Sequence, residues 1–489
     1  MPREHNIEVV IIGGGVGGLA MGIALKRQLN FRHFKIYEKS GDVGGTWHDN
    51  TYPGCACDID AHWYSLSTDL NPYWNKTHVP HHEIKSYWRD LTVKYSLSDQ
   101  IILNRNVTSA DWDNKKQLYR IRSHDVQTNE NFEDEAHIVI SATGILSVPS
   151  YPKDLDSIKN FKGPTFHSAR WDHSVDLKNK RVAVLDHVVT VARNFFRLLL
   201  RSHQPKSSIS VVRLIGTSNG NWIMLRQEIL YKTLLSGQQS WLGGLFTKQL
   251  EKYMRAKAPE EYHDRVIPEY RFGCKRFIID TGYLAALHRP NFDLNYDGIA
   301  NITEDGLITK KGEEFKFDVI IFATGFVVDK YPINVRGVEG ITVQEYYDRK
   351  GGPEGYFGVS LPGFPNFFTL AGPNTTTTHA SVIFTEEVQI NYILKFIRRI
   401  IQGQATSFEV SSEANDSFNK ELQEKLSKSV WSNCTSWYRL GHEGKVFSQW
   451  PGTMTQYWWR LRNPVWRDYK VVDVGDTTSP EDSDGRLLE

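Results

Sequence analysis

One stretch near the N-terminus constrains the fold more than any other feature of the chain. The apolar run at residues 9–12 leads directly into a glycine-rich turn that spans Gly13 to Gly18. Gly13 permits a tight turn, Gly15 lets phosphate groups approach the backbone, and Gly18 lets a following helix pack closely on the strand. Glu38 ends the next apolar run, about twenty residues further on, where a carboxylate accepts a hydrogen bond from a ribose hydroxyl. We therefore predict a doubly wound α/β domain that binds a dinucleotide at this turn.

A second stretch of the same kind begins at residues 182–185 but lacks the glycines. Asp186 and Val188 occupy the positions of the first two glycines. The side chain of Val188 blocks the close approach of phosphates, and the carboxylate of Asp186 repels a dianionic ligand. Apolar residues then recur at helical spacing over 188–199. The pattern predicts a second Rossmann-like unit that folds but holds its dinucleotide weakly or not at all.

Length, charge and cysteine count limit the classes of function. A chain of 489 residues is too long for one hydrophobic core, so about two or three lobes are expected. The net charge of +1 gives no electrostatic reason to expect nucleic acid or a membrane surface as a partner. The sequence contains no apolar run of membrane-spanning length and no leader pattern, so a cytoplasmic protein is expected. Cys55, Cys57, Cys274 and Cys434 do not make a disulfide framework, which favours a reduced compartment.

Two apolar strands that both end in Ala-Thr-Gly indicate where the chain crosses between domains. The first ends at residues 142–144 and the second at 323–325, with a mainly helical, amphipathic stretch over 222–270 between them. The predicted divisions are 1–164 for the first part of the dinucleotide-binding domain, 165–315 for an inserted Rossmann-like unit with a helical subdomain, 316–473 for the second part, and 474–489 for a disordered tail.

Four further motifs resemble one known family. They are Gly44 to Asp58 (GGTWHDNTYPGCACD), Phe161 to Asp172 (FKGPTFHSARWD), Cys274-Lys275-Arg276 with Asp280 to Tyr283, and Ala371 to Asn374 (AGPN). The second fits the fingerprint FxGxxxHxxxW[PD] at every specified position. The chain therefore resembles the flavin-binding class B monooxygenases, and specifically the Baeyer–Villiger monooxygenases, from Val9 to about Tyr469.

The resemblance implies FAD on the first Rossmann-like unit and marks the residues around it. In the family, the arginine that matches Arg276 lies beside the isoalloxazine and stabilises the anionic oxygen species that attacks a ketone, and the aspartate that matches Asp58 orients it. The residues that match His167 and Trp171 couple the flavin and nicotinamide domains. With the residues of the glycine turn, the predicted cofactor contacts are Gly13, Gly15, Gly18, Glu38, Lys39, Gly45, Thr46, Trp47, Asp58, Tyr64, Val107, Gly325 and Asn374.

Two other clusters have structural interpretations. His78, His81, His82 and Glu83 are interpreted as the start of a helix over 83–95 rather than a metal site, because no second group of ligands is in view. The aromatic segments at 434–438, 450–452 and 457–459 are interpreted either as the lining of a hydrophobic substrate pocket or as ordinary core packing.

The predicted function is that of an FAD-dependent oxidoreductase. By the resemblance it acts with O2. A hydrophobic pocket lined by the aromatic segments would suit a small metabolite of polyketide or terpenoid type, as in secondary metabolism. The family uses NADPH, but Asp186 and Val188 predict impaired or absent direct use of it. The alternative is a non-redox isomerase or cyclase that keeps FAD as a structural or electrostatic element. A third hypothesis, a flavoprotein kept only for binding, is disfavoured because Arg276 and Asp58 are both present.

Overall fold

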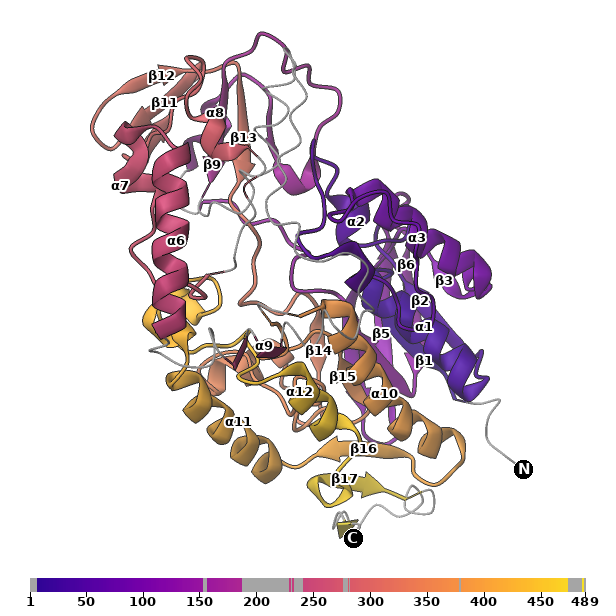
Figure 1. The fold of residues 1–489 in the computed structure, drawn as a ribbon. Helices are drawn as coiled ribbons and strands as arrows, with labels where there is room; N and C mark the ends of the chain where they lie inside the picture. Colours follow the sequence, from indigo (N-terminus) through magenta and orange to yellow (C-terminus); the bar gives the residue numbers. More distant parts are fainter. Residues whose placement is uncertain are drawn as a thin grey trace.

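The structure is a computed structural model. It describes residues 7–152, 156–186, 228–229, 231–232, 241–275, 280, 282–377, 380–473 and 486–487. Two lobes are visible in Figure 1, a larger one that contains both ends of the described chain and a smaller one at the upper left. No helix among the described residues is long and apolar enough to span a membrane.

The larger lobe is built on a five-stranded parallel sheet. Its strand order is β15-β7-β1-β2-β3, with bounds Phe367–Thr369, Ile138–Ser141, Val9–Ile12, Phe34–Tyr37 and Ile101–Ile102. Alternate residues of β1 face opposite layers, as the two-residue period of a strand requires. Val9 and Ile11 pack in the cluster that contains the helices α1 (Val16–Leu29), α3 (His81–Lys94) and α10 (Val382–Ile401). This burial on both faces explains why the strand reads as an uninterrupted apolar run.

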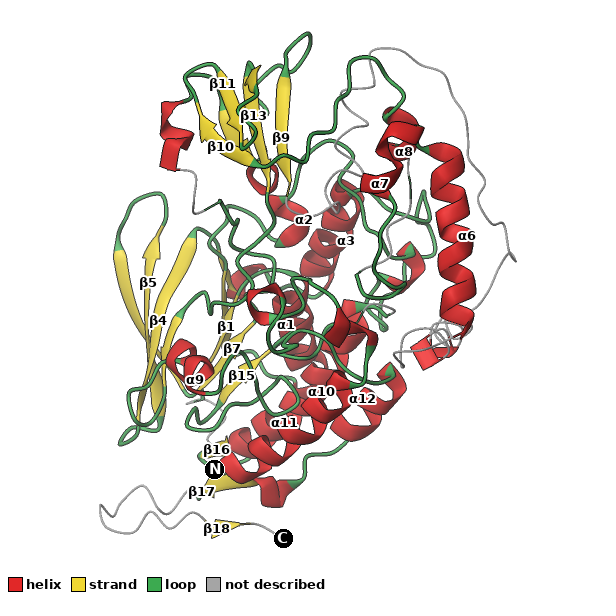
Figure 2. Cartoon of the chain, turned by 90° about the vertical axis from the view of Figure 1, so that its left-hand side faces the viewer, coloured by secondary structure: helices red, strands yellow, loops and turns green. Residues whose placement is uncertain are grey.

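The opposite face of the parallel sheet is covered by a second sheet. Val10 and Ile12 pack against β4 (Arg105–Asp113) and β5 (Leu118–Asp125). The strand order of this sheet is β14-β4-β5-β6, where β6 is Asn131–Ala136 and β14 is Asn334–Arg336. Figure 2 shows the resulting three layers, with β4 and β5 on one side of β1, β7 and β15 and the helices on the other.

The smaller lobe contains the inserted unit. Its parallel sheet has the order β8-β13-β9, with bounds Thr165–His167, Val319–Ala323 and Val182–Asp186. An antiparallel sheet of β10 (Ile299–Ile302), β11 (Gly306–Thr309) and β12 (Glu314–Lys316) accompanies it, with α6 (Trp241–Lys257), α7 (His263–Val266) and α8 (Tyr283–Ala286). The predicted helix over 188–199 lies outside the described residues.

The predicted boundary at 315/316 is wrong by one strand. β13 was assigned to the second part of the dinucleotide-binding domain, but it hydrogen-bonds on both sides to β8 and β9 of the smaller lobe. The chain therefore crosses back only after Ala323. The error arises because an apolar strand that is buried on both faces carries no local mark of the sheet it joins.

The second part of the larger lobe is mainly helical. It contains α9 (Val343–Arg349), α10, α11 (Ser412–Ser427) and α12 (Met454–Leu461). A small sheet is formed by β16 (Ser407–Val410), which lies between α10 and α11, with β17 (Tyr469–Val472) and β18 (Arg486–Leu487). Most of the predicted disordered tail lies outside the described residues, but β18 pairs with β17, so the disorder prediction is wrong at these two positions. Short helical turns lie at Thr46–Asp49 (α2), Ala61–Trp63, Ser98–Gln100, Asp156–Asn160, Ser168–Arg170, Glu260–Tyr262, Val430–Asn433, Leu440–His442 and Trp466–Asp468.

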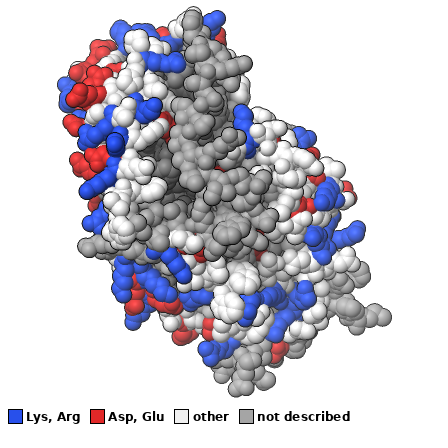
Figure 3. Space-filling model, viewed as in Figure 1, with Lys and Arg blue, Asp and Glu red and all other residues white. Residues whose placement is uncertain are grey.

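Charged side chains of both signs are interspersed over the described part of the face in Figure 3. This distribution agrees with the near-zero net charge of the chain. It gives the described surface on this side no large field of one sign.

Candidate active site

The glycine-rich turn connects β1 to α1 and leaves space that no other residue would leave. Gly13 has a φ of +113°, and a Cβ there would overlap the carbonyl group of Ala142. A Cβ at Gly18 would overlap the carbonyl oxygen of Gly13, so the helix could not pack as it does. Gly45, with a φ of +53°, faces Gly15, and a Cβ on Gly45 would lie 2.8 Å from the Gly15 Cα. The turn is therefore an open cradle at the start of α1.

No capping side chain accepts a hydrogen bond from the backbone amides in the first turn of α1. Gly15 is the N-cap and supplies no side-chain hydrogen bond, and the first turn contains no acidic residue. A helix N-terminus carries a partial positive charge and free N–H donors. Among the described residues, nothing acidic in this turn competes with an anionic ligand, which is the arrangement that binds phosphate groups.

Glu38 lies beside this cradle and is almost fully buried. Its carboxylate accepts a hydrogen bond from the Gly14 amide at 2.7 Å and another from the Ser40 amide at 2.8 Å. Each carboxylate oxygen keeps a further lone pair for a ligand hydroxyl. Lys39 points toward the segment that follows β7, where its ammonium donates to the Ser147 carbonyl oxygen at 3.5 Å.

The segment after Gly45 brings an aromatic pair to the cradle. Thr46 begins α2, and the indole N–H of Trp47 donates to the hydroxyl of Tyr64 at 2.9 Å. The two rings meet edge to face with centroids 5.3 Å apart. Burial raises the pKa of Tyr64 well above its ordinary value, so this hydroxyl is protonated at neutral pH. Val107, another predicted contact, is buried in β4 next to a bulge.

The two crossovers between the lobes run alongside each other. The Ser150 amide donates to the Gly325 carbonyl oxygen at 2.9 Å, and the Val327 amide donates to the Val148 carbonyl oxygen at 2.8 Å. His167 is buried at this junction, where its Nδ1 accepts from the Ala169 amide at 3.0 Å. Burial and, to a smaller extent, the charge of Arg170 lower the pKa of His167 to about 4. The ring is therefore neutral at physiological pH.

Asn374 lies in the Ala-Gly-Pro-Asn turn before α10, and of its side-chain amide only the NH2 group is hydrogen-bonded to the described protein. Its φ is +57°, and its side-chain amide donates to the Val446 and Gln449 carbonyl oxygens at 3.1 and 3.0 Å. Its Oδ1 is buried and accepts no hydrogen bond from the described protein. A buried acceptor without a donor is costly, so a ligand group is expected to supply one.

Of the two predicted catalytic residues, the structure describes only Asp58. It is exposed and follows Cys57, whose amide donates to the Val79 carbonyl oxygen at 2.8 Å. Arg276 lies outside the described residues, and the separation of its guanidinium from Asp58 stays a prediction. Further along the chain, Asp280 accepts hydrogen bonds from the amides of Gly282 and Tyr283 at 2.8 and 2.7 Å.

Cys274, two residues before Arg276, forms a disulfide with Cys434. Their Cα atoms lie 6.0 Å apart although 160 residues separate them in the sequence. The sequence-based interpretation that the four cysteines make no disulfide framework did not foresee this pair, and Cys55 and Cys57 are buried and take no part in it. Sequence spacing could not reveal the pair, because only the fold brings the inserted unit and the C-terminal segment together.

Two side chains of α10 belong to this region and were missed in the sequence. The side-chain carbonyl of Gln389 accepts from the Ala371 amide at 2.9 Å, so it fixes the turn that carries Asn374. Glu386 is buried against Gly17, where a Cβ would lie 2.9 Å from its Oε1. The available signal was a pair of carboxylates, Glu386 and Glu387, within an otherwise apolar helical run.

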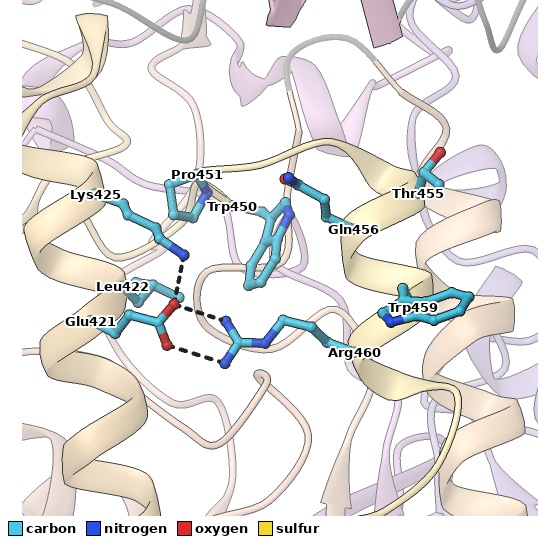
Figure 4. A pocket seen from close by; sticks show the side chains of 9 residues that line it. All are labelled: Glu421, Leu422, Lys425, Trp450, Pro451, Thr455, Gln456, Trp459 and Arg460. Carbon is cyan, nitrogen blue, oxygen red and sulfur yellow. Dashed lines mark hydrogen bonds and ion pairs between the residues drawn. The ribbon is translucent and has the colours of Figure 1, made fainter.

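The aromatic C-terminal segment serves two purposes. Tyr438 and Tyr457 are buried in the core, as the packing interpretation predicted. Trp459 and the buried Trp450 line a pocket of about 420 Å³ between α11 and α12, shown in Figure 4. The Glu421 carboxylate in this pocket is paired with Lys425 and Arg460 at 2.6 and 3.2 Å.

A second pocket of about 310 Å³ lies next to the aromatic pair. It is lined by Trp47, His48, Thr51, His81, His82, Lys85, Ser86 and Arg89. The helix predicted over 83–95 is confirmed and begins two residues earlier, at His81. Among the described residues no group of three His, Cys, Asp or Glu side chains could hold a metal ion.

The described residues fit FAD at three points. The cradle at α1 has room and N–H donors for the pyrophosphate, Glu38 has acceptor capacity for a ribose hydroxyl, and the Asn374 Oδ1 needs a donor. These points lie in the segments that follow β1, β2 and β15, at the carboxyl ends of the parallel strands, where open α/β sheets bind their ligands.

Comparisons with known proteins agree with this arrangement. Residues 11–77 match the family model described as an NAD(P)-binding Rossmann-like domain. The chain is 34% identical to a Baeyer–Villiger monooxygenase of Pseudomonas aeruginosa over 97% of this chain and 92% of that protein. It is 32% identical to a Baeyer–Villiger monooxygenase of Streptomyces coelicolor over 96% and 93% of the two chains.

The fold is also that of solved structures. A crystal structure described as the OTEMO complex with FAD and NADP superimposes with a TM-score of 0.79 at 22% identity, over 94% of this chain and 97% of that chain. This likeness confirms the predicted α/β fold with two Rossmann-like units. Because its relatives in two bacteria match it over nearly their whole length, the chain belongs to the Baeyer–Villiger monooxygenases, which are flavin-dependent oxidoreductases.

Proposed function

We propose that this chain binds one FAD non-covalently and inserts an oxygen atom beside the carbonyl carbon of a hydrophobic ketone. One atom of O2 enters the new C–O bond of the ester, and the other leaves as water with two electrons and two protons from a reductant. The observation that carries the proposal is the cradle at α1 with the buried Glu38 beside it. Bound FAD would supply the redox chemistry that activates oxygen.

The residues of the chain divide the remaining work. The glycine turn and the start of α1 bind the pyrophosphate, and Glu38 orients the ribose. Trp47 and Tyr64 form an apolar wall that excludes water, supported by their mutual hydrogen bond. Arg276, which is charged at every accessible pH, stabilises negative charge that develops on oxygen, and Asp58 orients its guanidinium. The disulfide at Cys274 and the turn at Asp280 anchor the described chain on either side of Arg276.

We further infer that NADPH reduces this enzyme slowly. β9 ends at Asp186, which pairs with Ala323 at the edge where the fingerprint glycine would lie. A solved structure of the same fold is described with both FAD and NADP, so the fold itself accommodates two dinucleotides. The altered residues Asp186 and Val188 are the basis for expecting weak binding in this chain.

The experiment follows the flavin under anaerobic conditions. Purified protein should carry about one FAD per chain, and NADPH at micromolar concentration should bleach it slowly in stopped-flow mixing. The variant Asp186→Gly with Val188→Gly should be reduced faster, and dithionite should reduce both proteins equally. Tight, fast reduction of the unaltered chain would show that the NADPH part of the proposal is wrong. A folded protein that takes up no FAD would contradict the whole proposal.

The same preparation distinguishes the oxygenase from the predicted alternative, a non-redox isomerase or cyclase. Turnover of a substrate at an unchanged rate under argon would favour that alternative. Turnover that stops under argon and resumes with O2 supports the oxygenase.

A further inference from the structure

Glu386 is a buried carboxyl group at the place where the cradle and α10 meet. Its side chain reaches Gly17 in the first turn of α1, where a Cβ would lie 2.9 Å from Oε1 and 3.2 Å from Cδ. The residue is 8% exposed, and its Oε2 is buried without a hydrogen-bond partner. An unpaired carboxyl group at this depth is strongly destabilising if it is ionised, and such a group calls for a functional explanation.

The neighbouring Glu387 shows what a satisfied carboxylate looks like on the same helix. Its Oε1 accepts from the Ser67 amide at 3.0 Å and from the Ser67 hydroxyl at 2.6 Å. Among the described titratable groups, Glu387 and Tyr64 interact electrostatically with Glu386. No lysine, arginine or histidine among the described residues forms an ion pair with it, so no described cation neutralises its charge.

We propose that Glu386 is a further cofactor-binding residue, which donates a hydrogen bond as a neutral carboxylic acid to the FAD chain where it passes the start of α1. This inference rests on the proposed function, because it takes FAD as the ligand of the cradle. A neutral acid offers one O–H donor, and the oxygens of the FAD pyrophosphate and ribityl chain are acceptors. A carboxylate in the same place would face the pyrophosphate with like charge and no donor.

The protonation state follows from the surroundings. Burial, with a smaller contribution from Glu387, raises the pKa of Glu386 to about 8. The group is therefore mainly neutral at pH 7 without FAD, and a bound pyrophosphate raises its pKa further. Because the pKa is higher in the complex than in the free protein, affinity is full below about pH 8 and falls as the pH rises above it, by up to about tenfold per pH unit.

The test measures FAD dissociation from the purified holoenzyme between pH 6.5 and 9.5. Free flavin is separated by ultrafiltration and quantified by its fluorescence, which gives a Kd at each pH without an activity assay. The wild-type Kd should be constant to about pH 8 and then rise roughly ten- to thirtyfold by pH 9.5. Glu386→Gln keeps an N–H donor and has no charge to gain, so its Kd should stay constant over the range.

Glu387→Gln is the matched control, since it lies on the same helix and removes one carboxylate. It should retain the rise in Kd and move it to lower pH, because one like charge near Glu386 is gone. Infrared difference spectra should show a protonated carboxyl band at pH 7 that is lost in Glu386→Gln and kept in Glu387→Gln.

The outcomes separate this inference from the proposed function. A wild-type Kd that does not change with pH, or a Glu386→Gln variant with the same rise as the wild type, would overturn the role of Glu386 and leave FAD binding intact. Wild-type protein that binds no FAD even at pH 6.5 would contradict the proposed function itself. The wild-type pH profile tests the inference even if a variant fails to fold.

Discussion

Replacing Glu38 by glutamine tests the cradle at its most specific point. Both carboxylate oxygens accept backbone amides, from Gly14 at 2.7 Å and from Ser40 at 2.8 Å. Glutamine has the same shape, but one of these positions becomes an NH2 group, which cannot accept. One of these two backbone amides, the buried one of Gly14 or the partly buried one of Ser40, therefore loses its partner in Glu38→Gln, whichever way the side chain turns.

Two separate magnitudes follow from this geometry. The unpaired amide costs about 1–3 kcal/mol in the free energy of unfolding, whether or not FAD is bound. The charge-assisted hydrogen bond to the ribose is lost in addition, which is worth about 1.5–3 kcal/mol of binding. The Kd for FAD should consequently rise by about ten- to a hundredfold.

The two effects are measured by urea denaturation of the flavin-free protein and by fluorescence titration with FAD. Glu135→Gln is the control, because Glu135 forms an exposed ion pair with Lys116 at 2.8 Å and should contribute less than about 1 kcal/mol. If Glu38→Gln bound FAD as tightly as the wild type, Glu38 would not contact the ribose. If its stability also matched the wild type, the hydrogen-bond assignment at Gly14 and Ser40 would be wrong.

Three further predictions concern Arg276, His167 and the disulfide. Arg276→Ala should retain FAD, since the pyrophosphate site lies at Gly13 to Gly18, but turnover should fall about a hundredfold or more, with partial rescue in Arg276→Lys; full activity would remove Arg276 from the site. His167 has a pKa of about 4 in the folded chain against 6.5 for the free side chain, so the unfolded chain binds more protons between these values. The free energy of unfolding should fall as the pH is lowered from 6.5 to 4, and thermal melts of His167→Asn should show a shallower fall, whereas an unchanged slope would contradict the burial argument. Cys434→Ser opens a loop of 160 residues and should lower the free energy of unfolding by up to about 5 kcal/mol. A reductant should lower the Tm of the wild type but not that of the variant. A wild type and a variant with the same Tm in the absence of reductant would refute the disulfide.

Features that depend on neighbouring residues in the sequence were predicted well. The turn at Gly13, its helix and the position of Glu38 follow from steric rules that act over a few residues, and the structure places Glu38 beside Gly14. Features that depend on tertiary pairing were not. The sheet that β13 joins, the Cys274–Cys434 disulfide and the burial of Glu386 against Gly17 arise only when distant segments meet.

The family resemblance added residues that no local rule could supply. Asn374 is an example, since nothing in its sequence context shows that its Oδ1 is buried without a donor. Arg276 is the reverse case: its motif is specific, but its contacts lie outside the described residues. The roles of both residues therefore stay predictions that mutagenesis must test.

The most direct measurement of the central claim is isotope labelling in a single turnover. The holoenzyme is reduced anaerobically with dithionite, which avoids the altered nucleotide site, and is then mixed with ¹⁸O2 and a panel of hydrophobic ketones. Mass spectrometry of the products should show esters that carry one ¹⁸O atom, with about one product molecule per bound FAD. Ketone conversion that proceeds equally under argon, or product without the label, would contradict the account.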